Sequence, residues 1–482
     1  MNTLLDNGFG TASKEQLDTL LKALQGGDYN VAPTSLVNGA ALQTESLDST
    51  LRSVTFDMKK LVLWPMIAKD KAYNLNEEYN RQTSYGESNN GGFFDANSGT
   101  APDERTAAYN RQQQKIAYIG DKRIVTHPLT LVAPAHGPII AGEIKNSTVW
   151  ILSNLERQLY EANGHFQTST GRYTGAIGDV PTGSAKFNGI DQQVRSGQVD
   201  ATAQFTGWEA YGGVKTPVKD LAGAAPTGDD IEDLALTVLD NHGMPDSFHM
   251  DHATHSALSK LFYPKERINS PGVSNGKAGY VLSEFVTSAG IMKLAGNVFL
   301  RPKKSPLAVA QTGAPAMPVI TSTGVEADTD TSLAAATYYY KASAINNKGE
   351  SVATAAEDQI VAANERATVV IAAGTAGAIY YAVYRAAAST GTYLFIGYVK
   401  DVSAGGGGGA TFRDAGKKEP GCATGYMLST DVDNLVWKQL APLMKMDLAI
   451  TGPAFQWMQL LYGTPIVPAP LHNGIMDNIG IG

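Results

Sequence analysis

Cysteine is almost absent from this chain of 482 residues, which contains only Cys422. A single thiol excludes an intrachain disulfide and a zinc site built from several thiolates. No run of eighteen apolar residues occurs, and the first residues, MNTLLDNGFGTASKEQ, lack a basic region followed by an apolar stretch. We therefore expect no membrane span and no secretory signal, and a chain that is made in a reducing cytoplasm.

Charge is also scarce, since only 17% of the residues are charged and the net charge is −8. Sequence-independent binding to DNA needs clustered Lys and Arg, so this composition argues against tight DNA binding. The chain is instead rich in Gly, with 50 residues, and in uncharged polar residues. Such a neutral, polar surface suits broad contacts with other protein.

The residue patterns of catalysis are missing as well. No G-x-S-x-G occurs, and the five glycines at 405–409 lack the Lys and Ser or Thr of a phosphate-binding loop. The adjacent carboxylates at 77–78 and at 232–233 diverge on a strand or a helix, so neither pair is a ready acid–base couple. We expect a protein that is not an enzyme and that carries no cofactor.

Three histidines, His249, His252 and His255, form an H-x-x-H-x-x-H run. On one helix they would be candidate ligands for a transition metal. The alternative places His249 at the end of a strand and His252 at the start of a helix, where the three side chains are solvated or capping. We favour the alternative and predict no metal site, with these three residues as the candidates if one exists.

Hydrophobic periodicity predicts three helices. A short one covers residues 13–25 after a Ser13–Gln16 capping box, and the longest covers 142–163, with Ile144, Ile151, Leu155 and Leu159 on one face. The third follows the capping sequence at 227–230 and ends at Gly243. Strands and a further helix are expected between 247 and 302, and short strands in the Gly-rich stretch 170–227.

Residues 73–127 have almost no apolar core. Alternating β-type segments lie at each end, from Glu78 to Tyr85 and from Lys115 to Val125, around a Gly- and Asn-rich centre. A structureless loop of this length is unusual inside a compact domain, whereas a two-stranded arm would account for it. Such an arm is unstable alone, so we expect it to lie on a neighbouring subunit, anchored by Phe93 and Phe94.

Composition changes near residue 303, and from about 312 to 422 short Ala-, Thr-, Val- and Tyr-rich segments alternate with turn residues. The clearest are YYYKASAINNKGES and YYAVYR. This spacing predicts a β-sandwich. Core-like sequence without a sandwich partner returns in WKQLAPLMKMDLAI and FQWMQLLYGTPIVPAP, so we interpret the sandwich as an insertion.

Several segments in order resemble the major capsid proteins of tailed bacteriophages of the Hong Kong 97 type. They are EEYNRQTSYG with FFDANSGTAPDER, IGDKRIVTHPLTLV, DDIEDLALTVLDNHGMP, LSKLFYPKERIN and WKQLAPLMKMDLAITGPAFQWMQLLYGT. The segment 312–422 resembles immunoglobulin-like or fibronectin type III domains. The resemblance implies an α+β capsid fold with an all-β sandwich inserted into it.

The resemblance also implies a division of the chain into six segments. These are an N-terminal arm with short helices (1–72), an extended loop (73–127), a peripheral domain with a spine helix (128–190), an axial and peripheral α/β body (191–311), the inserted immunoglobulin-like domain (312–422) and a return to the capsid body (423–482).

The function that the resemblance implies is a structural shell subunit, forming hexamers and pentamers around double-stranded DNA without sequence-specific contacts. Its partners would be itself, a portal and scaffolding or decoration proteins, with no membrane, in a virion assembled in the host cytoplasm. Candidate intersubunit contacts are Trp64, Phe93, Phe94 and Arg105. Two alternatives stay open: an encapsulin-like compartment, and a secreted carbohydrate-binding protein or adhesin with a fibronectin-like module.

Overall fold

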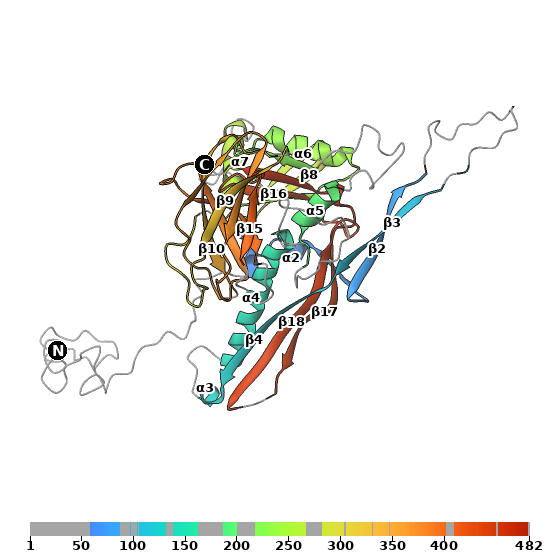
Figure 1. Cartoon of the computed structure of the whole chain (residues 1–482). Helices are drawn as coiled ribbons and strands as arrows, with labels where there is room; N and C mark the ends of the chain where they lie inside the picture. The colour runs from blue at the N-terminus through green and yellow to red at the C-terminus, as the bar shows by residue number, and fades with distance from the viewer. Residues whose placement is uncertain are drawn as a thin grey trace, which may run out of the picture. The chain divides into compact units, whose positions relative to one another are not determined.

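The protein is a mixed α+β chain that is rich in strands (Figure 1). The computed structural model describes the following residues: 58–86, 97, 104, 106–131, 138–161, 187–199, 217–266, 282–302, 305–329, 331–346, 348–401, 409–449 and 452–480. Most of them belong to one unit, which spans 56–125 and 143–482. The described residues of a second unit are Thr126, helix α3 (His127–Leu131) and residues 138–142, which include the start of α4.

A four-stranded sheet has the order β1-β17-β18-β4. Its strands are β1 (Ala68–Lys71), β4 (Ala117–Thr126), β17 (Val436–Asp447) and β18 (Ala454–Ile466). The short β1 runs parallel to β17, and β17 and β18 form a long antiparallel hairpin. Segments from opposite ends of the described chain therefore meet in one sheet.

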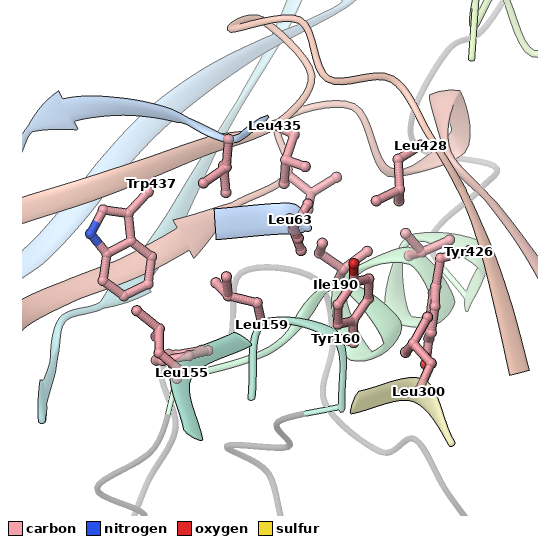
Figure 2. Close-up of a cluster of buried hydrophobic side chains, with 14 of the residues drawn as sticks. Leu63, Leu155, Leu159, Tyr160, Ile190, Leu300, Tyr426, Leu428, Leu435 and Trp437 are labelled. Carbon is pink, nitrogen blue, oxygen red and sulfur yellow. The ribbon is translucent and has the colours of Figure 1, made fainter. Parts of the chain in front are cut away.

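Helix α4 (Ile139–Glu161) lies along one face of this sheet. Ile151, Leu155 and Leu159 are buried in a cluster with Trp437 and Leu461, as the apolar periodicity of the helix requires. Figure 2 shows side chains of α2 (Leu63–Met66), α4, α5 (Ile190–Val199), β16 (Ala423–Leu428) and β17 converging on this cluster. The predicted apolar face of the helix is confirmed, with Ile144 half-buried at its end.

A six-stranded mixed sheet has the order β5-β19-β16-β6-β8-β7. In addition to β16 it contains β5 (Val218–Asp220), β6 (Ser247–Met250), β7 (Glu284–Thr287), β8 (Gly290–Gly296) and β19 (Gly474–Ile479). Helices α6 (Gly228–Asp240) and α7 (His252–Glu266) pack against it, and Ile231, Leu234 and Val238 of α6 are buried in its core. The predicted cap of α6 is a capping box between Thr227 and Asp230.

Strands β2 (Asn76–Ser84) and β3 (Ala108–Lys115) form a separate two-stranded antiparallel sheet, which we call the arm. Its register pairs Asn76 with Lys115 and Gln82 with Tyr109. The segment expected from Lys115 to Val125 is a strand, but its expected pairing in the arm is wrong: residues 117–126 form β4 of the four-stranded sheet, and β3 takes the place beside β2. The reason is that Ala117 and Val125 are buried on the face of β4 that turns toward α4, whereas the polar β3 sequence has no apolar alternation to reveal a strand.

Residues 320–414 form two antiparallel sheets around a shared core. One has the order β11-β10-β13-β14 and the other β15-β12-β9. The strands are β9 (Ile320–Ala327), β10 (Ala336–Ile345), β11 (Glu357–Val361), β12 (Glu365–Ile371), β13 (Tyr380–Ala386), β14 (Leu394–Lys400) and β15 (Ala410–Asp414). Tyr340, Val369 and Val383 are fully buried between the sheets.

Other expectations have mixed outcomes. The stretch 170–227, expected to hold only short strands, contains helix α5, whose Ile190 and Val194 are buried against α4. The expected helix at 13–25 lies outside the described residues. The described part of the chain also contains short 3₁₀ helices at Met58–Lys60, Val298–Leu300 and Pro470–His472. Within the described chain, no helix has the length and apolar character that crossing a membrane requires.

Candidate assembly surfaces

The arm has no hydrophobic core of its own, since neither strand contributes to a buried apolar cluster of the described chain. Its exposed face carries Glu78, Arg111 and Tyr109, with Glu78 and Arg111 paired across the strands at 3.4 Å. Tyr85 and Tyr109, near the end of the ladder where the chain leaves β2, are 77% and 70% exposed. A polar two-stranded ribbon with exposed rings is marginal in water, so it suits contact with other protein.

Hydrogen bonds from side chains hold the root of the arm. Gln193 on α5 fixes the segment at the end of β18 to which the arm is bonded: its Nε2 donates to Pro465 O at 2.9 Å, and Val467 N donates to its Oε1 at 2.9 Å. Arg81 on β2 donates to Val467 O at 3.3 Å. The amide side chains of Asn188 and Gln114 meet at 3.5 Å. The start of the arm is therefore fixed to the described body through polar groups.

The sheet β1-β17-β18-β4 has a second face, turned away from α4, which we call the outer sheet face. Its apolar side chains are Tyr118, Ile124, Met444, Met446, Met458 and Tyr462. Met446 and Met458 are cross-strand partners and so share a face. Tyr118 lies edge-on to Tyr462 at 5.0 Å between ring centroids. Tyr118 and Ile124 are 54% and 55% exposed.

The opposite face of the same sheet is occupied by α4. Gln459 on β18 accepts from Thr148 and donates to Ile144 O, and Arg123 on β4 reaches Glu143 at 3.3 Å. One face is thus covered by the chain itself. The outer sheet face presents several exposed apolar side chains, which suits a protein–protein contact.

Trp64, a predicted intersubunit contact, lies on the short helix α2 and is half-buried in its own chain. Its ring meets Trp437 edge-on at 5.4 Å, and Lys69 Nζ lies 4.5 Å from its centroid. At least part of the ring therefore packs within the subunit. The other three candidates, Phe93, Phe94 and Arg105, lie outside the described residues, and their role stays a prediction.

A fully buried carboxylate, Glu156 of α4, holds the backbone around Trp64. Its oxygens accept from the N–H groups of Val62, Leu63 and Trp64 at 3.0, 2.7 and 2.8 Å, and from Asn297 Nδ2 at 2.8 Å. Four donors on one carboxylate compensate for its burial. Sequence reasoning missed this residue, because nothing in a helical pattern shows that a Glu faces inward.

From Asn297 the hydrogen bonds continue into the six-stranded sheet. Asn297 Nδ2 donates to Tyr160 Oη at 3.2 Å, and Tyr160 Oη lies 2.7 Å from His249 Nδ1. His249 Nε2 lies 3.1 Å from Ser247 Oγ, which donates to Leu428 O at 3.4 Å. Because Tyr160 accepts from Asn297, its own hydrogen is directed to Nδ1, and the ring proton of neutral His249 is then on Nε2.

The three histidines occupy different environments. His249 is buried at the third position of β6 with both ring nitrogens hydrogen-bonded, and His252 is exposed at the start of α7. His255 Nε2 donates to Leu282 O at 2.6 Å. Over the residues that the structure describes, no three His, Cys, Asp or Glu side chains are grouped to hold a metal ion. The strand and the helix of the predicted alternative are present, but His249 is buried and hydrogen-bonded, not solvated or capping as expected.

The end of the 320–414 sandwich is tied to the six-stranded sheet. Asn478 on β19 donates to Lys417 O at 3.0 Å and accepts from Glu419 N at 2.9 Å. It adopts a left-handed backbone conformation with φ 51°, which Asn tolerates better than most residues. Thr424 adds a hydrogen bond to Asp477 at 3.1 Å. These hydrogen bonds therefore hold the chain that leaves the sandwich against β19.

Comparison with known proteins finds no matching family model and no matching curated protein. Among solved structures, the chain is similar to the capsid of a native GTA particle (TM-score 0.43, 10% identity, 92% of this chain and 99% of that chain). It is also similar to the capsid of Myoviridae Phage XM1 (0.41, 9%, 92% and 99%). A third is the holo-SrpI encapsulin complex from Synechococcus elongatus PCC 7942 (0.39, 10%, 93% and 97%). At identities of 10% or less, no residue's role is carried over from these proteins.

Proposed function

We propose that this chain is a structural subunit of a closed protein shell. The observation that carries the proposal is the arm, a polar two-stranded ribbon without a core, in a chain whose four-stranded sheet leaves the outer sheet face uncovered by α4. A two-stranded arm is unstable alone, and an exposed apolar face is stabilised when other protein covers it, so contact between the two would stabilise both. In the proposal, the arm of one subunit lies on the neighbouring subunit.

The energetics of such a shell come from many modest contacts. Covering one large apolar side chain contributes roughly 1.5–3 kcal/mol. Tyr85 and Tyr109 on the arm and Tyr118 and Ile124 on the outer sheet face are each more than half exposed in the single chain. Repeated around a closed ring, contacts of this size sum to a stable assembly, because each subunit is held at several places at once.

Within this proposal, the shell is the capsid of a tailed phage, built from hexamers and pentamers around double-stranded DNA. The support is the ordered sequence resemblance and the net charge of −8, which would keep the wall from binding the packaged DNA tightly. Its partners would be further copies of itself, a portal and scaffolding or decoration proteins. The subunit would be assembled in the host cytoplasm and reside in the virion.

The sandwich would be an immunoglobulin-like domain displayed on the outside of the shell. Its four-stranded and three-stranded sheets share one core, and the chain crosses between them after β9, β11, β12 and β14. Seven strands in two such sheets are typical of immunoglobulin-like sandwiches. An inward domain repeated on every subunit would take volume from the genome. The presence of this domain favours a phage capsid over an encapsulin-like compartment.

Electron microscopy of the purified protein tests the proposal, with closed shells as the expected result. Exchanging Tyr109 for Ser should leave a folded subunit that closes shells poorly, because the change removes an exposed ring from the arm. Ile360→Ser is the matched control: Ile360 is 69% exposed on β11 of the sandwich, away from the proposed contacts, and should not affect closure. Deleting 89–101 should abolish closure.

The proposal fails if the purified protein remains monomeric under all conditions that assemble related shells. It also fails in its assignment of the arm if Tyr109→Ser and the 89–101 deletion both close shells as efficiently as the unmodified chain.

A further inference from the structure

We propose that the hydrogen-bond chain from Glu156 through Asn297, Tyr160 and His249 to Ser247 is an acid-sensitive latch. It joins the backbone at Val62–Trp64 to the six-stranded sheet, and a proton added to His249 breaks it. The inference concerns the folded subunit itself and does not depend on assembly. We call these five residues the latch.

The direction of the hydrogen bonds explains the sensitivity. Tyr160 Oη accepts from Asn297 Nδ2 and must donate to His249 Nδ1, at 2.7 Å. A proton on Nδ1 would turn that nitrogen into a donor, so two hydrogens would point at each other across a short contact. The ring of Tyr160 is fully buried and packs against Tyr426 at 5.3 Å between centroids, so its hydroxyl has little room to move away.

The surroundings of His249 offer little to stabilise the charged ring. On the neighbouring strands its partners are Tyr426 of β16 and Ala295 of β8, and α4 contributes Tyr160. The carboxylate of Asp246 lies close enough to favour the charged form, but it is bonded to Thr430.

Further charges face this region from other elements. Glu156 of α4 accepts from four donors, and Asp191 of α5 pairs with Arg195 and receives a hydrogen bond from Tyr426. Neither is bonded to the imidazole. Burial therefore dominates, and it lowers the pKa of His249 from 6.5 to about 4.

The sign of the effect follows from this depressed pKa. The latch is fully stabilised above pH 6.5 and weakens as the pH falls toward 4, because the opened state binds the proton more readily. With these two pKa values, the equilibrium constant for opening rises about thirtyfold between pH 7.5 and pH 5.

The segment that the latch releases is the backbone of Val62–Trp64. Glu156 accepts from the three consecutive N–H groups at Val62, Leu63 and Trp64, which begin α2 just before β1. Acid opening would detach the beginning of the described chain from α4 while the sandwich, which has its own core, stays folded.

Hydrogen–deuterium exchange on the full chain tests the latch, with rates corrected for the intrinsic effect of pH. The amides of Val62, Leu63 and Trp64 should lose about thirtyfold protection between pH 7.5 and pH 5. In His249→Gln, which cannot take up a proton, the loss should be less than about threefold. His255→Gln is the matched control and should retain the full loss, because His255 bonds to Leu282 O and not to the latch.

Tyr160→Phe provides a second variant in case His249→Gln does not fold. It keeps His249 buried but removes the link to Asn297, so the amides at 62–64 should exchange faster at pH 7.5 and show little further acid loss. An unchanged acid loss in His249→Gln, or no loss in the unmodified chain, would overturn the latch. So would a parallel loss in β13 of the sandwich, since this would mean global unfolding.

Discussion

Leu155 provides the sharpest test of the core that supports the proposed surfaces. Its side chain is 1% exposed in the cluster formed by α4, Trp437 and Leu461 (Figure 2). Replacing it with Ala removes buried apolar atoms and leaves a cavity that rigid neighbours on two elements cannot fill. The lost transfer free energy and the cavity together should cost roughly 2–5 kcal/mol.

Urea unfolding followed by tryptophan fluorescence measures this cost. The five tryptophans are residues 64, 150, 208, 437 and 457, so none lies in the sandwich, and the signal reports the body of the protein. The midpoint should fall with little change in slope.

Leu236→Ala is the matched control, because Leu236 is the same residue type on a helix, α6, but is 41% exposed. It should cost less than about 1 kcal/mol. An equal cost for the two variants, or a cost below about 1 kcal/mol for Leu155→Ala, would refute the assignment of this helix face to the core.

Three further predictions concern the sandwich and its attachment. Asp414→Asn should lower the stability of the sandwich by about 3–5 kcal/mol, because it removes the negative charge that lies closest to the buried Arg385, at 2.6 Å; thermal melting followed by near-ultraviolet circular dichroism checks this. Asn478→Ala should cost roughly 2–4 kcal/mol, because it removes three side-chain hydrogen bonds and places a Cβ-bearing residue in the left-handed conformation; Asn478→Gly should cost less, because it removes the hydrogen bonds without the left-handed strain, as measured by urea unfolding. Replacing the inserted segment 312–422 with a short Gly-Ser bridge should still permit shells by electron microscopy, and complete failure to assemble would place the sandwich in the lattice.

The elements with strong periodicity were predictable from the sequence. The α4 and α6 helices, the strand and helix around His249 and the strands of the sandwich follow local patterns that match their burial. The strand β3 was not predictable, because AYNRQQQK has neither apolar alternation nor β-branched residues, and only its pairing with β2 makes it a strand.

The buried polar network was equally hidden. Glu156 and His249 are 141 and 48 positions from Asn297, and nothing local distinguishes them from solvated residues. Their roles depend on three elements meeting, which a single sequence does not specify. Sequence reasoning recognised that His249 ends a strand but not that its ring nitrogens would both be engaged.

The parallel pairing of β1 with β17 has a consequence for the order in which the protein folds during synthesis. Asp70 on β1 pairs with Lys438 on β17, and β5 pairs with β19 at residues 475–477. The four-stranded sheet therefore stays incomplete until residue 466 has emerged and the six-stranded sheet until residue 479, whereas the sandwich has all its strands once residue 414 has emerged. The insertion should thus fold first, from contacts that are closer in sequence, while the growing body exposes unpaired strand edges. Chaperone dependence during synthesis should accordingly reside in the body and not in the sandwich.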